Sequence, residues 1–381
     1  MKWEKVRLED CCYSISDGDH QPPPKAQQGI PFVTISNINS MNQLDFSDTM
    51  FVPKEYYQSL DEKRKVRKGD VLYSVVGSFG IPVLIKEERP FVFQRHIAIL
   101  RPKEDIVDSG FLFYTMLNRD FYAKADAVAI GAAQRTVSLG SLRNIKIDVP
   151  SLESQKHIAD ILSAYDDLIE NNQKQIKLLE EAAQRLYKEW FVDLRFPGHE
   201  NTKVVDGVPE GWRKFPLEEI APVVTGKKDA NYGDKGGNYP FFTCSQETIT
   251  APGYSFDTSA VILAGNGDFN VKLYRGKFEA YQRTYVLAPF DHSNLFNLYF
   301  TVQDNMEALA KGASGSTIKF LTKGMLQKIL VLTADKKVLD KFNDYEENIQ
   351  QKVEALKKQV EDLTEIRNRL LPKLMSGEVE V

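Results

Sequence analysis

The chain has 381 residues, of which 42% are hydrophobic and 27% are charged, and its formal net charge at pH 7 is -4. This length exceeds what one hydrophobic core usually supports, so two domains are expected. No apolar run approaches the roughly 18 residues that cross a bilayer, and the N-terminal stretch lacks the apolar centre of a secretory signal, which excludes a membrane protein and indicates a cytoplasmic one.

The first 150 residues predict a β-rich domain. Residues 71–76, 97–100 and 145–149 are β-branched or aromatic and are bounded by Gly, Pro or Asp, as strands between turns are. The intervening loops are rich in polar residues, which is where binding side chains are usually found. Cys11, Cys12 and the distant Cys244 lack the spacing of a metal site or a disulfide framework, so we assign the cysteines no role.

A long helix is predicted next, from about residue 152 to 187. Its apolar positions alternate spacings of four and three, as in one seam of a coiled coil: Ile158, Leu162, Tyr165, Ile169, Ile176, Leu179, Ala183 and Leu186. Asn172 falls in the same seam, where a lone polar residue can fix register; the alternative is that Asn172 faces solvent. At 1.5 Å per residue the helix is about 50 Å long, more than one small domain requires.

The remainder of the chain repeats this plan. The repeat is carried by the following matches: Trp3 and Leu8 with Trp212 and Leu217, residues 31–36 with 240–245, residues 69–77 with 258–267, Gln94-Arg95 with Gln282-Arg283, and Leu142, Ile145 and Ile147 with Leu326, Ile329 and Val331. A second coiled-coil seam follows, made of Phe342, Ile349, Val353, Leu356, Val360, Leu363 and Leu370. Since neither helix can bury its stripe alone, we expect the two helices to pair antiparallel.

This organisation resembles the specificity subunits of type I restriction-modification systems. The resemblance rests on Asp17-Gly18-Asp19-His20, on the strand entries at residues 68–72 and 93–96, on Glu153-Ser154-Gln155 at the helix start, and on the ending at residues 370–377. It covers almost the whole chain, although the second repeat has residues 225–232 in place of the Asp-Gly-Asp-His turn. The fold class that it implies is α+β, with two β-rich target-recognition domains joined by two long antiparallel coiled-coil helices in a pseudo-two-fold internal repeat.

The expected boundaries are residues 1–150 for the first recognition domain, 151–196 for the central spacer helix, 197–333 for the second recognition domain with a core from about residue 212, and 334–381 for the C-terminal spacer helix. The resemblance implies a non-catalytic subunit that reads an asymmetric, bipartite duplex target. Its implied partners are double-stranded DNA and two methyltransferase subunits, with restriction or translocase subunits as further candidates. The chain needs no cofactor of its own, because S-adenosylmethionine would belong to the methyltransferases.

Reading base edges requires side chains with paired donors or a donor and an acceptor, and positioning requires cations and hydroxyls at phosphates. In the first domain the loop residues of this kind are His20, Gln21, Lys25, Ser36, Asn37, Ser78, Gln94, Arg95, His96, Gln134 and Arg135. In the second domain they are Lys227, Lys228, Asn231, Tyr232, Ser245, Gln246, Asn266, Asn270, Gln282, Arg283, Ser316, Thr317 and Lys319.

The Gln-Arg pair is the strongest of these candidates because it recurs at equivalent positions of the two repeats. Recurrence also fits a structural role, in which carboxylates inside each domain hold Arg95 and Arg283. Asp17, Asp19 and His20 could bind a metal, but no further ligand motif accompanies them, and a turn or a DNA contact is favoured over a metal site.

Two other classes of function stay open. One is a non-catalytic scaffold whose coiled coil joins two β-rich ligand-binding domains, and the other is an independent nuclease or methyltransferase with unrecognised motifs. The apolar residues 190–192 and 374–375 are candidates for docking partner subunits, and packing within their own domains is the alternative.

Overall fold

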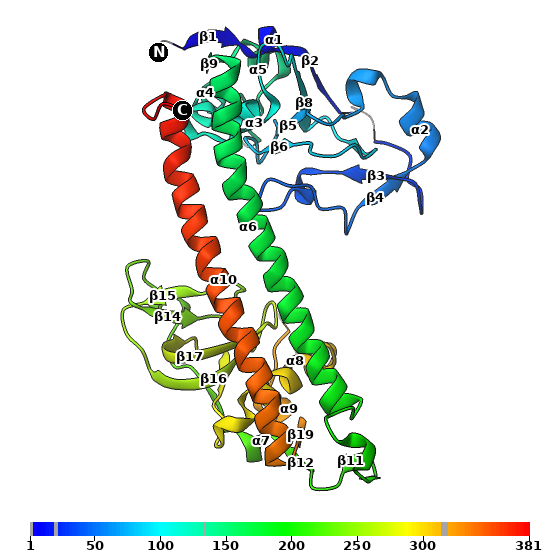
Figure 1. Cartoon of the computed structure of the whole chain (residues 1–381), viewed down its shortest axis with the longest axis vertical. Helices are drawn as coiled ribbons and strands as arrows, with labels where there is room; N and C mark the ends of the chain where they lie inside the picture. Colours follow the sequence, from blue (N-terminus) through cyan, green and yellow to red (C-terminus); the bar gives the residue numbers. More distant parts are fainter. Residues whose placement is uncertain (1–2, 19–21, 133, 314–318) are drawn as a thin grey trace. The chain divides into compact units, whose positions relative to one another are not determined.

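The computed structural model describes residues 3–18, 22–132, 134–313 and 319–381 (Figure 1). The chain divides into two compact units, Met1–Gln173 with Lys358–Val381 and Lys174–Lys357, and each is described by itself. The unit with the N-terminus is called the first unit. None of the helices in the described ranges has the length and apolar content that crossing a membrane requires.

The first unit is built on antiparallel strands. They are β1 (Glu4–Arg7), β2 (Cys12–Asp17), β3 (Ile30–Val33), β4 (Met50–Val52), β5 (Val71–Ser74), β6 (Pro82–Leu84), β7 (Val92–Phe93), β8 (Ile97–Pro102) and β9 (Lys146–Val149). Within the described residues they form a sheet of order β2-β8-β5-β6, a second of order β4-β3-β7 with one parallel pair, and the pair β1-β9.

Strands β5 and β8 are buried on both faces, and their alternating side chains build two cores. Val71, Tyr73 and Ala98 point into one core with Phe111, whereas Leu72 and its neighbours on β8 point into another with Val33 and Phe93. The helices of this unit are α1 (Leu8–Cys11), α2 (Lys54–Ser59), α3 (Ser109–Leu117), α4 (Arg119–Ala127) and α5 (Leu139–Asn144), with 3-10 turns at η1 (Ile35–Asn37) and η2 (Glu62–Arg64).

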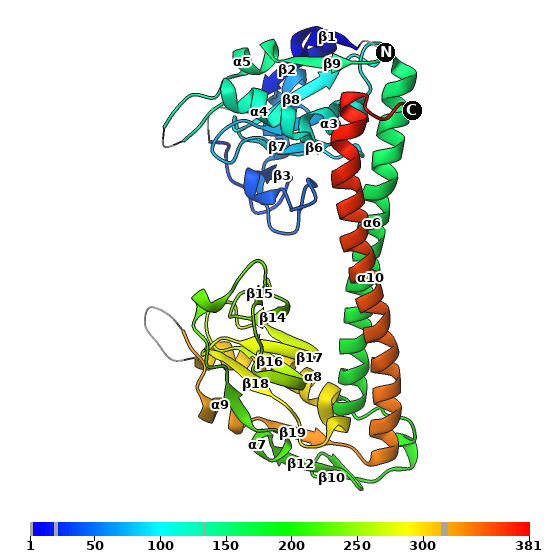
Figure 2. The same ribbon diagram turned by 90° about the vertical axis from the view of Figure 1, so that its left-hand side faces the viewer.

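The second unit has the same plan, but two of its strands are longer than their counterparts in the first unit (Figure 2). Its elements are β10 (Val204–Val205), β11 (Val208–Pro209), β12 (Arg213–Pro216), α7 (Leu217–Ile220), β13 (Val223–Thr225), β14 (Tyr239–Phe242), β15 (Ile249–Ala251), β16 (Phe256–Ala264), β17 (Val271–Ala280), β18 (Thr284–Leu287), α8 (Leu295–Gly312), α9 (Lys323–Gln327) and β19 (Leu330–Thr333), with 3-10 turns at η4 (His199–Asn201), η5 (Ala230–Tyr232) and η6 (His292–Asn294). One described sheet runs β13-β18-β16-β17-β14-β15, because β17 spans the positions that β6 and β7 hold separately in the first unit.

Backbone hydrogen bonds establish which residues correspond. The amide of Leu8 donates to the carbonyl of Ile145 at 2.9 Å, and the amide of Leu217 donates to that of Ile329 at 2.8 Å. Strands β3 and β14 pair in the same sense with β7 and β17, which places Phe32 opposite Val92 and Phe241 opposite Glu279. The repeat that the sequence predicts is therefore a repeat of the fold.

The Gln-Arg recurrence is shifted by one residue in this register. In the turn before β8, the amide of Ile97 donates a hydrogen bond to the carbonyl of Gln94 at 3.1 Å. In the turn before β18, the amide of Thr284 donates to the carbonyl of Tyr281 at 2.8 Å. Gln94 therefore corresponds to Tyr281, and His96 corresponds to Arg283. The prediction that Gln-Arg stands at equivalent positions is wrong, because the shared feature is the turn and not the dipeptide.

The long helices are α6 (Leu152–Tyr187), which continues into a π-helical turn over Lys188–Val192, and α10 (Lys336–Ser376). In the first unit, the start of α6 lies antiparallel beside the end of α10 (Figure 1). There Asp166 accepts from Arg367 at 3.0 Å, and Asn172 donates to Gln359 at 3.2 Å. Asn172 is 7% exposed, so it lies in the seam and the solvent-facing alternative is wrong.

In the second unit, the end of α6 lies beside the start of α10, where Lys357 forms an ion pair with Glu180 at 3.0 Å. The predicted seam positions of both helices are buried or half-buried. The seam also contains Glu346, which is fully buried and which sequence analysis did not select because its side chain is charged.

The apolar helix ends pack within their own units and do not form exposed docking surfaces. Trp190 and Phe191 are each 5% exposed and pack with Trp212 and Phe342 in the second unit. Leu374 is 1% exposed in the largest core of the first unit. Of the predicted docking residues, Val192 is the one with a largely exposed side chain.

A buried ion pair joins β5 and β8, the two central strands of the first unit's larger sheet. Asp70, at the start of β5, accepts from both the Nε and Nη2 atoms of Arg101, at 3.0 and 2.9 Å, and from the backbone amide of Arg67 at 2.8 Å. The hydrogen bond to Asp70 raises the pKa of Arg101. Cys11 and Cys12 are buried nearby as free thiols, and burial raises the pKa of Cys11 to about 11.

Candidate nucleic-acid interface

In the first unit three loops meet at one end of the sheet. The amide of Val75, just after β5, donates to the carbonyl of His96 at 2.8 Å. The amide of Gly77 donates to the carbonyl of Arg135 at 3.0 Å, and Gly77 has φ +72°, a left-handed conformation that suits glycine. The loops around residues 77–80 and 94–96 and the described residues 130–132 and 134–137 are thereby held against one another.

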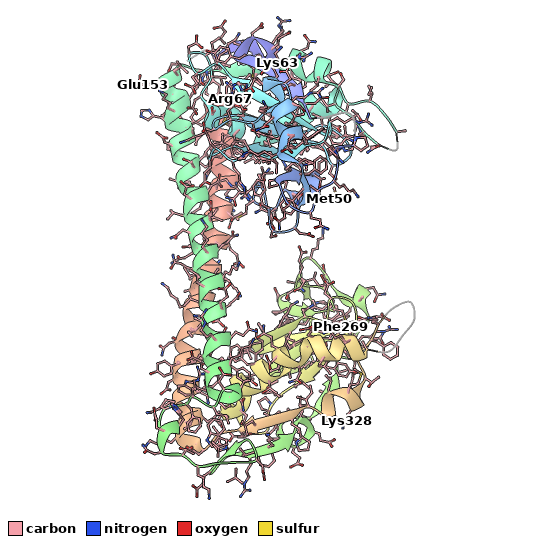
Figure 3. The ribbon with its side chains drawn as sticks, turned by 90° about the vertical axis from the view of Figure 1, so that its right-hand side faces the viewer. Met50, Lys63, Arg67, Glu153, Phe269 and Lys328 are labelled. Atoms are coloured by element: carbon pink, nitrogen blue, oxygen red, sulfur yellow. The ribbon has the colours of Figure 1, made fainter. Side chains whose placement is uncertain are left out.

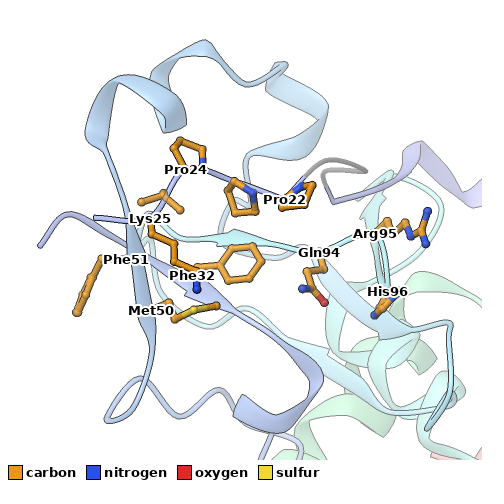
Figure 4. Close-up of a pocket in the computed structure, with 11 residues that line it drawn as sticks. Pro22, Pro24, Lys25, Phe32, Met50, Phe51, Gln94, Arg95 and His96 are labelled. Carbon is orange, nitrogen blue, oxygen red and sulfur yellow. The ribbon is translucent and has the colours of Figure 1, made fainter. Parts of the chain in front are cut away.

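Four of the predicted contact residues in the first unit line one hollow. Lys25, Gln94, Arg95 and His96 surround a cavity of about 300 Å³ together with apolar side chains (Figure 4). Arg95 is exposed, and within the described residues its guanidinium makes no ion pair. The structural alternative, in which a carboxylate of the domain holds Arg95, therefore finds no support.

A second group lies on the adjoining loops. Ser78 and Gln134 are exposed, and they lie on the two loops that the Gly77–Arg135 hydrogen bond joins. Arg135 forms an ion pair with Asp126 at 2.6 Å, and its guanidinium lies 5.9 Å from the centre of the Phe79 ring. Its charge is partly neutralised at this position.

Ser36 and Asn37 are committed to their own turn. The hydroxyl of Ser36 is 2.7 Å from that of Thr34. The side-chain amide of Asn37 accepts from the backbone of Thr34 at 2.9 Å and donates to the carbonyl of Asp48 at 3.1 Å. With both ends of its amide engaged, Asn37 is positioned to shape the loop and not to read a base.

The second unit gathers its predicted residues at the corresponding end of its sheet. The amide of Gln282 donates to the carbonyl of Lys228 at 2.9 Å, and the amide of Gly265 donates to the carbonyl of Arg283 at the same distance. Asn266 bridges to Phe320 next to that contact. Arg283 is exposed and, like Arg95, makes no ion pair within the described ranges.

Some of these side chains are engaged locally. The ammonium of Lys228 lies 4.3 Å from the centre of the Tyr232 ring, and the amide of Gln282 reaches Asp229 at 3.4 Å. Asn270 donates to the carbonyl of Cys244 at 3.1 Å. Lys227, Asn231, Ser245, Gln246 and Lys319 are exposed on the same unit.

One cation in this group was missed. Lys272, on β17, donates to the carbonyl of Ser245 at 2.8 Å, and burial lowers the pKa of its ammonium. Lys272 lies in a strand, whereas the residues predicted from the sequence were chosen from polar loops. His20, Gln21, Ser316 and Thr317 lie outside the described residues, as does Asp19. In the part of the chain that the structure describes, no group of three or more His, Cys, Asp or Glu side chains could hold a metal ion.

The family assignment follows from the sequence matches to known proteins. The family model described as the type I restriction modification DNA specificity domain matches residues 1–181 and 209–362. These ranges contain both repeats. The chain belongs to this family.

The specificity subunit of the type I restriction enzyme EcoDI of Escherichia coli is 37% identical over 176 residues, which are 45% of this chain and 39% of that protein. The MjaIX specificity subunit of Methanocaldococcus jannaschii is 26% identical over 82% of this chain and 78% of its own length. The HindI specificity subunit of Haemophilus influenzae is 24% identical over 99% of each chain.

Among solved structures, the S subunit of a type I restriction-modification system from M. genitalium superposes with a TM-score of 0.66 at 16% identity, covering 98% of this chain and 96% of that one. This likeness confirms the predicted α+β fold with two β-rich domains and two long helices.

Proposed function

We propose that this chain is the DNA-specificity subunit of a type I restriction-modification enzyme, which reads an asymmetric, bipartite duplex target and positions partner subunits on it. The observation that carries the proposal is the repeated loop surface. Each unit brings exposed cations and amides together at the same end of its sheet, on the turn before β8 or before β18. These are the groups that contact phosphates and base edges.

The two surfaces differ in the residues that they present. Arg283 occupies the position of His96, and Tyr281 occupies that of Gln94. Side chains with different donors and acceptors select different base edges, so the two halves of the target differ in sequence.

The long helices act as the spacer between the half-sites. Their apolar seam is buried or half-buried along both helices, as a stiff coiled coil requires. Adding one heptad to α6 and one to α10 keeps the seam in register and adds about 10 Å of helix. At about 3.4 Å per base pair, the preferred spacer should grow by about three base pairs.

The chemistry belongs to the partners. Two methyltransferase subunits, with S-adenosylmethionine as their cofactor, would take a target base out of the duplex, while this chain determines where they bind. Restriction or translocase subunits would complete the assembly. The chain purified alone should transfer no labelled methyl group to DNA, and transfer without a partner would contradict the non-catalytic role.

Binding to a library of duplexes tests the proposal. The chain, combined with the methyltransferase encoded beside it, should select two fixed half-sites separated by a fixed number of variable bases. Arg283→Ala should weaken this binding and lower the slope of log affinity against log salt by about one if it contacts a phosphate. Arg213→Ala is the matched control, because Arg213 is also exposed on the same unit but lies on β12 and not in these loops.

A scaffold that joins two β-rich ligand-binding domains should show no salt-sensitive duplex affinity. Selection of a single uninterrupted site, or no selection at all, would contradict the proposed function.

A further inference from the structure

The hollow in the first unit combines an apolar floor with polar groups on its rim. Phe32 and Val52 form the floor and are 2% and 1% exposed. Pro22, Pro23 and Pro24 also line it, with Pro22 and Pro24 across from Phe32 (Figure 4). Met50, a further lining residue, is 47% exposed and lies at the surface of the first unit (Figure 3). An apolar hollow on a surface that otherwise presents cations and amides indicates a ligand with an apolar group of its own.

The amide of Gln94 lies on this rim, between the Phe32 ring and His96 (Figure 4). Its side chain makes no hydrogen bond to the described part of the chain, so both its donor and its acceptor are available. In the major groove, an adenine offers a donor and an acceptor that match such an amide, and its paired thymine presents a methyl group beside them. An amide next to an apolar hollow therefore complements the edge of an A·T pair.

The second unit shows what happens when this space is filled. The amide of Gly18 donates to the carbonyl of Ile97, and that of Gly226 donates to Thr284. The amides of Ala26 and Asp234 likewise donate to the carbonyls of Phe51 and Thr250. Ala26 lies as many residues after Gly18 as Asp234 lies after Gly226. With equal spacing between these matched points, Pro24 corresponds to Tyr232.

Tyr232 packs edge-on against Phe241, the counterpart of Phe32, with ring centres 6.1 Å apart. The chain's own aromatic ring thus lies where the first unit has its hollow. The counterpart of Gln94 is Tyr281, which has no amide. Both features of the A·T-reading arrangement belong to the first unit and are replaced in the second.

We propose that the hollow of the first unit is a base-pair-specificity site, in which Gln94 bonds the major-groove edge of an adenine and the apolar wall of Phe32, Met50 and Pro24 receives the methyl group of its paired thymine. The proposal rests on the proposed function. Lys25 and Arg95, exposed on the rim, supply positive charge for the adjoining phosphates.

A uracil scan tests the apolar half of this site. Each thymine of the selected target is replaced in turn by deoxyuridine, which removes the methyl group and leaves the Watson–Crick edge unchanged. The complex of chain and methyltransferase should lose affinity about fourfold at one position of the half-site read by the first unit, as expected for one buried methyl group.

Two variants assign that effect to the hollow. Pro24→Tyr copies the second unit's filling ring and should abolish the uracil effect, whereas Gln58→Tyr, on the exposed face of α2 outside the hollow, should preserve it. Gln94→Ala should reduce the preference for A·T over G·C at the same pair, which is about tenfold or more in the wild type. Gln94 is half-buried on the rim of the hollow, so its replacement by Ala should leave the fold intact. Gln94→Ala therefore tests the site even if Pro24→Tyr fails to fold.

Selective, tight binding with no uracil-sensitive position in that half-site would overturn this inference and leave the proposed function standing. An unchanged uracil profile in folded Pro24→Tyr would overturn it as well. Failure of the wild-type complex to select any duplex would instead remove the proposed function.

Discussion

Glu346 gives the strongest quantitative test of the helix pairing in the second unit. Its carboxylate is fully buried in the seam of α10, and neither oxygen has a hydrogen-bond partner among the described residues. Phe342 and Ile349 lie one turn away on the same face, and the phenol of Tyr299 is an ionisable group near the carboxylate. Burial without a partner raises the pKa of Glu346 from 4.5 to about 8.

The sign of the pH dependence follows from proton uptake. Between pH 4.5 and about 8 the folded unit keeps the proton on Glu346 whereas the unfolded chain releases it, so stability falls as pH rises through this window and levels off above it. At pH 7 the destabilisation is on the order of 3 kcal/mol, from 2.5 pH units at about 1.36 kcal/mol each. Glu346→Gln removes the ionisation and therefore this pH-dependent loss.

The measurement is thermal unfolding of wild type and Glu346→Gln at pH 5, 6, 7 and 8. The melting temperature of the variant relative to wild type should rise by roughly 5–10 °C between pH 5 and pH 7. This interval corresponds to about 2.5 kcal/mol, and 1 kcal/mol corresponds to about 2–4 °C in a unit of this size. Glu354→Gln, an exposed position on the same helix, should give a difference that does not vary with pH. Parallel pH profiles for Glu346→Gln and wild type would refute the reasoning.

Three further substitutions test other contacts. Asp70→Asn should destabilise the first unit by about 3–5 kcal/mol in chemical denaturation, because it leaves Arg101 without its buried partner; a loss below 1 kcal/mol would show that the pair is solvated. Asn172→Leu should stabilise the helix pair by about 1 kcal/mol or more while relaxing its register. Crosslinking between the helices would detect the change of register, and a less stable variant would contradict the assigned seam position. Leu374→Ala should cost about 2–5 kcal/mol, and hydrogen exchange should then speed up in β1 and β9 but not in β12 and β19.

Patterns with a physical period allowed much of the fold to be predicted. The seam spacing of the first helix predicted residues 152 to 187, and α6 has these bounds. The repeat was visible because Leu8 and Leu217 occupy the same buried place in their units. Glu346 escaped prediction because a seam search selects apolar side chains, and burial of a charge is decided by what surrounds it.

The candidate site was less accessible to sequence analysis. Gln94 and Arg95 could be chosen from the sequence because they are polar residues of a loop. Phe32 could not, because its importance comes from the hollow above it. The Gln-Arg match gave a wrong alignment of the two repeats because two identical adjacent residues suggested equivalence. The true correspondence is set by the turn geometry, which the backbone hydrogen bonds reveal. Asn37 was chosen for its amide, yet neighbouring backbone groups use both ends of that amide.

The core of the first unit has a consequence for synthesis on the ribosome. That core is completed by Leu371, Leu374 and Met375 from the end of α10, and Trp3 lies against Gly377. The N-terminal strands of the first unit therefore cannot complete their packing until α10 has been synthesised. Residues 174–357 are contiguous and can close their own core sooner. The half of the protein that is translated first is finished last, and until then its unfilled apolar face is open to chaperones and proteases.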